Sequence, residues 1–143
     1  MSGQNEVSMG QKKKVLIVDD ERDIVKVLMI RLRGAGYEVV TAFDGAQAIF
    51  VAHKEKPDLV ILDIRMPAGD GFSVVEKLKH STNTFSIPVI FLTGGPERDS
   101  EEKAMTLGAR FYIKKPYDPE ELLDAVKRAL EKDSDTSSDH RDH

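Results

Sequence analysis

The sequence contains no cysteine among its 143 residues, which excludes disulfide bonds and thiolate metal sites. It also has no run of 18 or more apolar residues, and its N-terminal residues lack the apolar stretch of a signal peptide. A membrane-spanning helix and a secreted product are therefore not expected. From these absences we predict a cytoplasmic protein that does not contact a membrane.

An excess of positive charge is absent as well. The net charge is −4 and the isoelectric point is about 5.6, so direct binding of nucleic acid is not indicated. The basic run at residues 12–14 is expected to be a solvated segment before the first strand. A hydrophobic content of 40% and a charged content of 32% are ordinary for a globular protein, and the length allows one domain with its own core.

Short apolar runs alternate with segments of helical periodicity along most of the chain. Unbroken apolar runs of this length are typical of strands that are buried on both faces of a parallel sheet. The strands are predicted at residues 15–18, 38–42, 59–62, 89–92 and 111–113. Strands that alternate with helices in this way indicate βαβ units with right-handed crossovers.

The helices are predicted from apolar periodicity together with start and stop signals. They are placed at residues 21–33, 44–54, 71–80, 96–108 and from Pro119 onward. Asp44, followed by Gln47, has the spacing of a capping box, and Asp118 is expected to cap the last helix. We therefore predict an α/β protein with one doubly wound (βα)₅ domain at residues 13–132. Residues 1–12 are expected to form a disordered lead, and residues 133–143 a disordered polar tail.

Residues able to handle a metal ion or a phosphate follow four of these strands. Asp19 and Asp20 follow the first strand, Asp63 the third, Thr93 the fourth, and Lys115 the fifth. Because ligands of an open parallel α/β sheet bind at the carboxyl ends of its strands, these side chains are expected to converge. Three carboxylates, a hydroxyl and an ammonium group together indicate a site for Mg²⁺ and a phosphoryl group.

Together and in this order, these motifs resemble the receiver domain of response regulators, the phospho-acceptor module of two-component signalling. The resemblance covers about residues 13–132. The matching motifs are Asp19-Asp20, the segment 63–71 with Pro67 and Gly71, Leu92-Thr93-Gly94, Gly108-Ala109 and Lys115-Pro116-Tyr117. It implies a flavodoxin-like, five-stranded parallel sheet of order 2-1-3-4-5 with helices on both faces.

The chemistry of the site is expected to centre on Asp63 as phospho-acceptor. A dianionic phosphoryl group that approaches clustered carboxylates is repelled by about 4 kcal/mol per pair of unit charges at ~4 Å and an effective dielectric of ~20, so a divalent cation is required. The resemblance implies Mg²⁺, with Mn²⁺ as an alternative. It implies that the ion is bound directly by Asp20, Asp63 and the backbone carbonyl of Arg65, and through water by Asp19. Lys115 is expected to bring the second positive charge to the phosphoryl oxygens.

Two further residues are expected to convert phosphorylation into a conformational change. The hydroxyl of Thr93 can bind a phosphoryl oxygen, and Tyr112 matches the aromatic switch residue of the family. The resemblance places the responding surface on the fourth helix, fifth strand and fifth helix. Gly94 is expected either to leave space for the phosphoryl group or to form only a tight connection. Arg65, two positions after the acceptor, is hypothesised to modulate hydrolysis of the acyl phosphate.

The resemblance implies a histidine kinase or a histidine phosphotransfer protein as the phosphoryl donor. The first helix carries more apolar residues than one buried face needs, and its exposed part is expected to contribute to docking of this partner; these residues are Ile24, Val25, Val27, Leu28, Met29 and Ile30. The output is expected to pass to a downstream protein or to an attached output domain. The polar tail favours a stand-alone receiver over a fragment of a longer regulator, and phosphorylation-dependent homodimerisation is left open.

Two other functions compete with this expectation. A phosphohydrolase with an aspartyl nucleophile, like the haloacid dehalogenases, needs an acidic residue two positions after the nucleophile, where this sequence has Arg65. A protein-interaction module that is not phosphorylated would not need the intact set of Asp19, Asp20, Asp63 and Lys115. We therefore expect a protein that is not an enzyme beyond catalysing its own phosphorylation and dephosphorylation.

Overall fold

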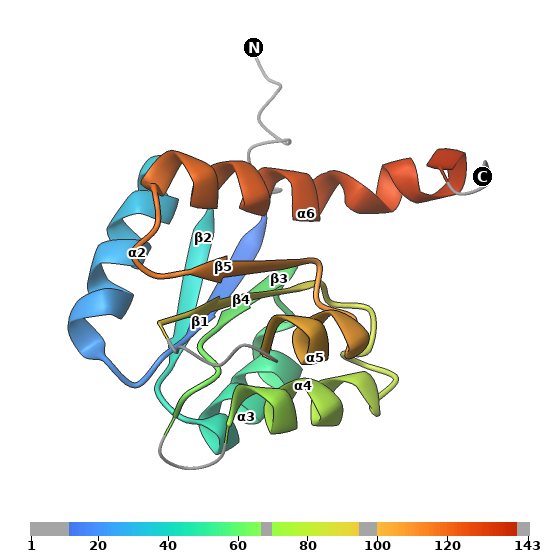
Figure 1. Ribbon diagram of the computed structural model, residues 1–143, viewed down its shortest axis with the longest axis horizontal. Helices are drawn as coiled ribbons and strands as arrows, with labels where there is room; N and C mark the ends of the chain where they lie inside the picture. The colour runs from blue at the N-terminus through green and yellow to red at the C-terminus, as the bar shows by residue number, and fades with distance from the viewer. Residues whose placement is uncertain (1–11, 67–69, 95–99, 140–143) are drawn as a thin grey trace.

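A computed structural model describes residues 12–66, 70–94 and 100–139. Within these ranges, five strands form one parallel sheet of order β2-β1-β3-β4-β5 (Figure 1). The strands are β1 (Lys14–Val18), β2 (Glu38–Ala42), β3 (Leu59–Leu62), β4 (Val89–Thr93) and β5 (Phe111–Lys114). The predicted doubly wound sheet and its strand order are confirmed.

Five helices of the described chain cover the two faces of the sheet. They are α2 (Arg22–Gly34), α3 (Gly45–Glu55), α4 (Gly71–Lys79), α5 (Ser100–Thr106) and α6 (Pro119–Asp139). Helices α2 and α6 lie on one face, and α3, α4 and α5 on the other (Figure 1). Successive residues of a strand point to opposite faces, so Leu16 joins the core under α3–α5 while Val15 and Ile17 join the core under α2 and α6. Burial on both faces explains the unbroken apolar runs.

Local hydrogen bonds start the helices where the sequence indicated. Asp44 accepts a hydrogen bond from the backbone N–H of Gln47 at 2.8 Å, and the Gln47 side chain accepts one from the N–H of Phe43 at 2.6 Å. The predicted cap of α3 is therefore confirmed. Asp70 caps α4 in the same manner by accepting from the N–H of Ser73 at 2.9 Å. This cap directly follows the segment that leads away from the carboxyl end of β3.

The structure differs from the prediction at the C-terminal end. Helix α6 continues to Asp139, so its backbone enters the segment that was predicted to be a disordered tail from residue 133. Residues 133–139 contain neither glycine nor proline, and nothing in their backbone stops a helix that is already formed. Residues 1–11 of the predicted N-terminal lead at 1–12, the predicted helix start at Pro96 and residues 140–143 lie outside the described residues. None of the described helices is both long and apolar enough to cross a membrane.

Candidate functional site

The sheet register brings the predicted site residues to one edge. Val18 pairs with Leu62, and Thr93 pairs with Lys114, so the following residues leave their strands at the same level. The backbone continues this alignment: the N–H of Asp63 donates to the carbonyl of Val18 at 3.0 Å, and the N–H of Lys115 donates to that of Thr93 at 2.8 Å. The convergence predicted from sequence is therefore a direct result of parallel pairing.

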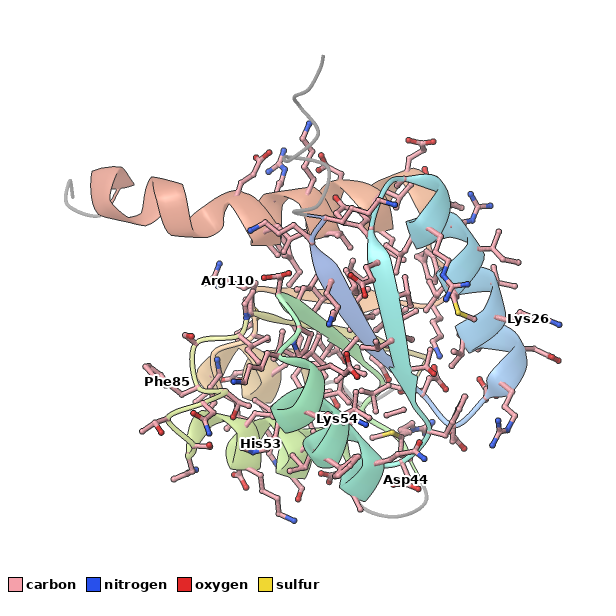
Figure 2. The ribbon with its side chains drawn as sticks, turned by 180° about the vertical axis from the view of Figure 1, so that it is seen from behind. Lys26, Asp44, His53, Lys54, Phe85 and Arg110 are labelled. Carbon is pink, nitrogen blue, oxygen red and sulfur yellow. The ribbon has the colours of Figure 1, made fainter. Side chains whose placement is uncertain are left out.

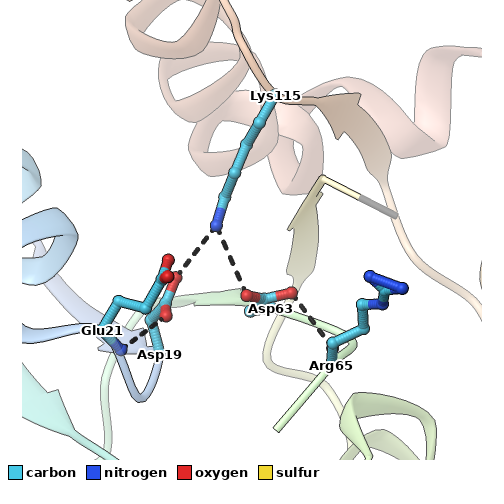
Figure 3. Close-up of polar contacts among 5 residues, drawn as sticks. All are labelled: Asp19, Glu21, Asp63, Arg65 and Lys115. Atoms are coloured by element: carbon cyan, nitrogen blue, oxygen red, sulfur yellow. Dashed lines mark hydrogen bonds and ion pairs between the residues drawn. The ribbon is translucent and has the colours of Figure 1, made fainter. Parts of the chain in front are cut away.

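Lys115 bridges two of the three predicted carboxylates (Figure 3). Its Nζ lies 3.3 Å from Oδ2 of Asp19 and 3.4 Å from Oδ2 of Asp63. The other oxygen of each carboxylate accepts a backbone hydrogen bond, from the N–H of Glu21 at 2.9 Å for Asp19 and from the N–H of Arg65 at 3.1 Å for Asp63. Asp19 is only 2% exposed and Asp63 only 7%, so their orientations are set by these contacts.

Burial and neighbouring charges shift the pKa values of the two partners. Burial raises the pKa of Asp63; the Arg65 N–H and the Lys115 ammonium oppose this, Asp19 adds to it, and the net pKa lies above its usual value. Burial alone would lower the pKa of Lys115, but Asp63 and Asp19 outweigh it and the net pKa is raised. The site therefore keeps Lys115 charged and makes the ionised form of Asp63 costly.

The carboxylates also form a candidate metal centre. Asp19, Asp20 and Asp63 each offer one oxygen, and these oxygens all lie within 4.8 Å of one another. Hard oxygen ligands at this spacing suit Mg²⁺ or Mn²⁺. A pocket of about 320 Å³ opens here, and its lining residues are Asp20, Glu21, Asp63, Arg65, Gly94 and Lys115. Asp19 is 2% exposed and is not among these lining residues.

Neither Thr93 nor Tyr112 is among the described residues that line this pocket. Thr93 is 1% exposed at the end of β4, and its neighbour Gly94 lines the pocket instead. Tyr112 pairs with Phe91, two residues before Thr93, so Thr93 and Tyr112 point to the same face of the sheet. The Tyr112 ring packs against the core under α3–α5, and its hydroxyl oxygen is buried. The structure thus has Tyr112 turned inward.

Arg65 and Gly94 line the pocket, and Gly71 lies against the backbone of Asp63. The Arg65 side chain is exposed, and its guanidinium points away from the Asp19 and Asp63 carboxylates (Figure 3). A Cβ at Gly94 would lie 3.7 Å from Cδ of Lys115, an ordinary contact, so Gly94 borders the lysine stem without crowding it. A Cβ at Gly71 would lie 2.7 Å from the carbonyl oxygen of Asp63, so only glycine fits there. The bond between Lys115 and Pro116 is cis.

Glu21 is the pocket residue that the sequence reasoning missed. It lines the pocket, precedes α2 as its N-cap residue, and donates its N–H to Asp19. Its position directly after the acidic pair was the available signal, but helical periodicity assigned it to the first turn of the helix. A fourth carboxylate therefore borders the candidate metal centre.

Comparison with known proteins agrees with this geometry. The family model described as response regulator receiver domain matches residues 15–127. This chain belongs to the response regulator receiver family. The receiver domain is 41% identical over 118 residues to the alkaline phosphatase synthesis transcriptional regulatory protein PhoP of Bacillus subtilis, a match that covers 82% of this chain and 48% of that protein. It is 41% identical over 125 residues to the probable transcriptional regulator ycf27 of Guillardia theta, covering 87% and 48%.

Solved receiver structures share the fold over nearly their whole length. The chemotaxis protein CheY4 of Vibrio cholerae has a TM-score of 0.78 and 34% identity, with 83% of this chain and 99% of that chain covered. A CheY-like receiver domain protein of Methanospirillum hungatei has a TM-score of 0.80 and 28% identity, with 86% and 97% covered. The chain spans about half the length of the curated relatives it matches, which are named as transcriptional regulators. It is a receiver domain of two-component signalling, a class that works with kinase partners and binds Mg²⁺ in general.

Proposed function

We propose that this receiver domain accepts a phosphoryl group on Asp63 from the phosphohistidine of a kinase or a phosphotransfer protein. The observation that supports this most is the placement of the Lys115 ammonium 3.4 Å from the Asp63 carboxylate, at a pocket that Asp20 also lines. A structural ion pair alone would not need the adjacent carboxylate of Asp20 or an open pocket above it.

The transfer needs one bond formed and one bond broken. An oxygen of Asp63 attacks phosphorus, the bond between phosphorus and the donor imidazole nitrogen breaks, and the nitrogen keeps the electron pair and takes up a proton. The transition state is loose, so the residues act mainly by positioning and by neutralising charge. The backbone N–H of Arg65 orients the Asp63 carboxylate, and Lys115 faces the oxygens of the incoming group.

Mg²⁺ is part of this proposal because the site offers carboxylate and carbonyl oxygens, the ligands that this ion prefers. Asp20, Asp63 and the carbonyl of Arg65 would bind it directly, with Asp19 acting through water. When bound, the ion neutralises the carboxylates and the phosphoryl oxygens, whose mutual repulsion would otherwise oppose transfer.

Switching is proposed to pass through Thr93 to the surface formed by α5, β5 and α6. A hydrogen bond from the Thr93 hydroxyl to a phosphoryl oxygen stabilises one of two existing conformations, the one with Tyr112 turned inward on the same face of the sheet. A charge-assisted bond of ~1.5–3 kcal/mol shifts such an equilibrium by roughly 10- to 150-fold. The α5–β5–α6 surface would then engage a downstream protein or an attached output domain.

The donor is proposed to dock on α2. Val27 is 52% exposed and Ile30 is 66% exposed on this helix, whereas Val25 and Leu28 are buried. Val27 also lines a groove of about 360 Å³ that reaches Lys115 and Pro116. Substituting Val27 and Ile30 with serine should slow transfer from the cognate kinase. Phe50→Ser is the control, because Phe50 is 64% exposed on α3, away from this face.

The proposed function is tested with phosphoramidate, a small donor with a phosphorus–nitrogen bond. Incubation with Mg²⁺ should produce a phosphoprotein that hydroxylamine cleaves, as expected for an acyl phosphate, and Asp63→Asn should abolish it. A phosphoprotein that resists hydroxylamine, or that still forms in Asp63→Asn, would contradict the proposal. Sustained turnover of phosphomonoesters would favour a phosphohydrolase instead.

A further inference from the structure

A second and larger groove lies beside the pocket at Asp63, which is called the phosphorylation pocket below; Arg65 lines both. The second groove has a volume of about 530 Å³, within the usual range for ligand sites, and it is open to the surface. Its lining residues come from the segment that follows β3 and from the N-terminal ends of α4 and α5, two of the helices on the α3–α5 side of the sheet. Its lining residues are Ile64, Arg65, Met66, Asp70, Phe72, Ser100 and Lys103.

The floor of this groove is apolar and held in place. Ile64, Met66 and Phe72 are 6–8% exposed, so each presents only a small part of its side chain. The Phe72 ring packs edge-to-face on Phe91, with 5.3 Å between the ring centres. This contact fixes Phe72, while the unbranched side chain of Met66 can adapt to the shape of a neighbour.

The rim of the groove carries two cations. The Lys103 ammonium lies 4.7 Å from the centre of the Phe72 ring, which places this charge directly over the floor. The exposed Arg65 also lines the groove. Among the described lining residues, Asp70 carries a carboxylate, which accepts the N-cap hydrogen bond from the N–H of Ser73 at 2.9 Å. Among the described lining residues the two cations outnumber this carboxylate, so an anionic group at the rim meets one net positive charge.

We propose that this groove binds a segment of a partner protein that presents a carboxylate next to an apolar side chain. The apolar side chain packs on Met66 beside the Phe72 ring, and the carboxylate lies between Arg65 and Lys103, where a guanidinium can bind it with two parallel hydrogen bonds. An inorganic anion would use the two cations but would leave the apolar floor uncovered. The combination of floor and rim is therefore what favours an acidic peptide.

Arg65 connects the groove to the phosphorylation pocket because it lines both. A carboxylate in the groove holds the guanidinium there, whereas a phosphoryl group on Asp63 attracts it to the other pocket. Coupling of this kind is reciprocal, so phosphorylation weakens docking and docking weakens the hold of Arg65 on the phosphoryl group. This coupling rests on the proposed function; binding in the groove does not.

Binding is tested by NMR titration of the ¹⁵N-labelled protein with a capped Leu-Asp-Leu peptide, beside a capped Leu-Asn-Leu peptide. Leu-Asp-Leu should shift the amides of Ile64, Met66 and Phe72, and the asparagine peptide should bind more weakly. Lys103→Gln should weaken binding by about three- to fivefold, the scale of one exposed ion pair, and Lys103→Arg should retain it. Lys54→Gln is the matched control on α3, outside the groove (Figure 2).

Several outcomes would overturn the proposal: equal binding of the two peptides, no effect of Lys103→Gln, or shifts confined to residues outside the groove. Identical shifts with sodium sulfate alone would mean a simple anion site and would also overturn it. Mg²⁺ with beryllofluoride should then weaken peptide binding by about threefold, again one ion pair, and unchanged binding would overturn the role of Arg65. The same titration on Asp63→Asn should retain peptide binding, which separates this proposal from the proposed phosphorylation.

Discussion

The ammonium nitrogen of Lys115 lies 3.4 Å from Oδ2 of Asp63, although 52 positions separate the two residues in the chain. The contact arises because the residues that follow β3 and β5 leave the sheet at the same edge. Lys115 also pairs with Asp19 at 3.3 Å, so one cation serves two buried carboxylates. The arrangement places a positive charge where we propose that the phosphoryl oxygens arrive.

Replacing Lys115 with methionine should slow phosphorylation of Asp63 by about 10- to 150-fold, because a charge-assisted hydrogen bond of ~1.5–3 kcal/mol is lost from the transition state. The rate is measured from the increase in phosphoprotein with time in a small phosphodonor and Mg²⁺. Lys114→Met is the control, since Lys114 is the exposed neighbour on β5. Equal rates for the two variants would contradict the role assigned to Lys115.

Asp63→Asn should stabilise the metal-free protein at neutral pH. Burial raises the folded-state pKa of Asp63 above its unfolded value, so the ionised carboxylate costs stability at neutral pH. The cost is relieved as the pH falls through the raised pKa, and the advantage of the asparagine variant should shrink over that range. Urea unfolding in EDTA measures it. Asp44→Asn is the control, because asparagine preserves the cap of α3. An advantage that grows on acidification would refute the account.

Gly71→Ala should destabilise the protein by about 1–3 kcal/mol, the usual cost of overpacking. The added Cβ would lie 2.7 Å from the carbonyl oxygen of Asp63 and 2.9 Å from Cα of Ile64, so the backbone beside the acceptor must move. Phosphorylation should slow as well. Gly34→Ala provides the comparison, because nothing lies within 4 Å of its added Cβ and alanine favours the helix. Similar stabilities of the two variants would contradict the close approach at Gly71.

Arg65→Ala should accelerate loss of the phosphoryl group from Asp63 by more than about twofold, because the guanidinium no longer pairs with the group or shields it from water. The half-life of the purified phosphoprotein in EDTA measures this. Arg33→Ala, on the exposed side of α2, is the matched control. A half-life within about twofold of the parent protein would show that Arg65 has no role in hydrolysis.

Most of the fold could be predicted because its signals are local. The apolar runs at 15–18 and 59–62 match two strands that are buried on both faces, and the Asp44 cap starts α3 where predicted. The end of α6 could not be predicted, because polarity at 133–139 does not by itself stop a helix that contains no glycine or proline. At residues 133–139 the polar composition does not decide whether the backbone is helical.

The site was predictable where topology alone brings residues together. Asp19, Asp63 and Lys115 each follow a parallel strand, so their convergence needs no knowledge of side-chain positions. The groove beside Met66 was not predictable, because Phe72 and Lys103 come from different helices and meet only through packing. The inward orientation of Tyr112 is likewise a property of the packed core and leaves no mark in the sequence.

The most direct test of the central claim is the intact mass of the protein after incubation with acetyl phosphate and Mg²⁺. The account predicts one added phosphoryl group, about 80 Da by its composition, that is absent in EDTA and absent in Asp63→Asn. An adduct that forms without Mg²⁺, or that persists in Asp63→Asn, would contradict it. So would the absence of any adduct together with a failure to bind beryllofluoride, which would leave a protein-interaction module that is not phosphorylated.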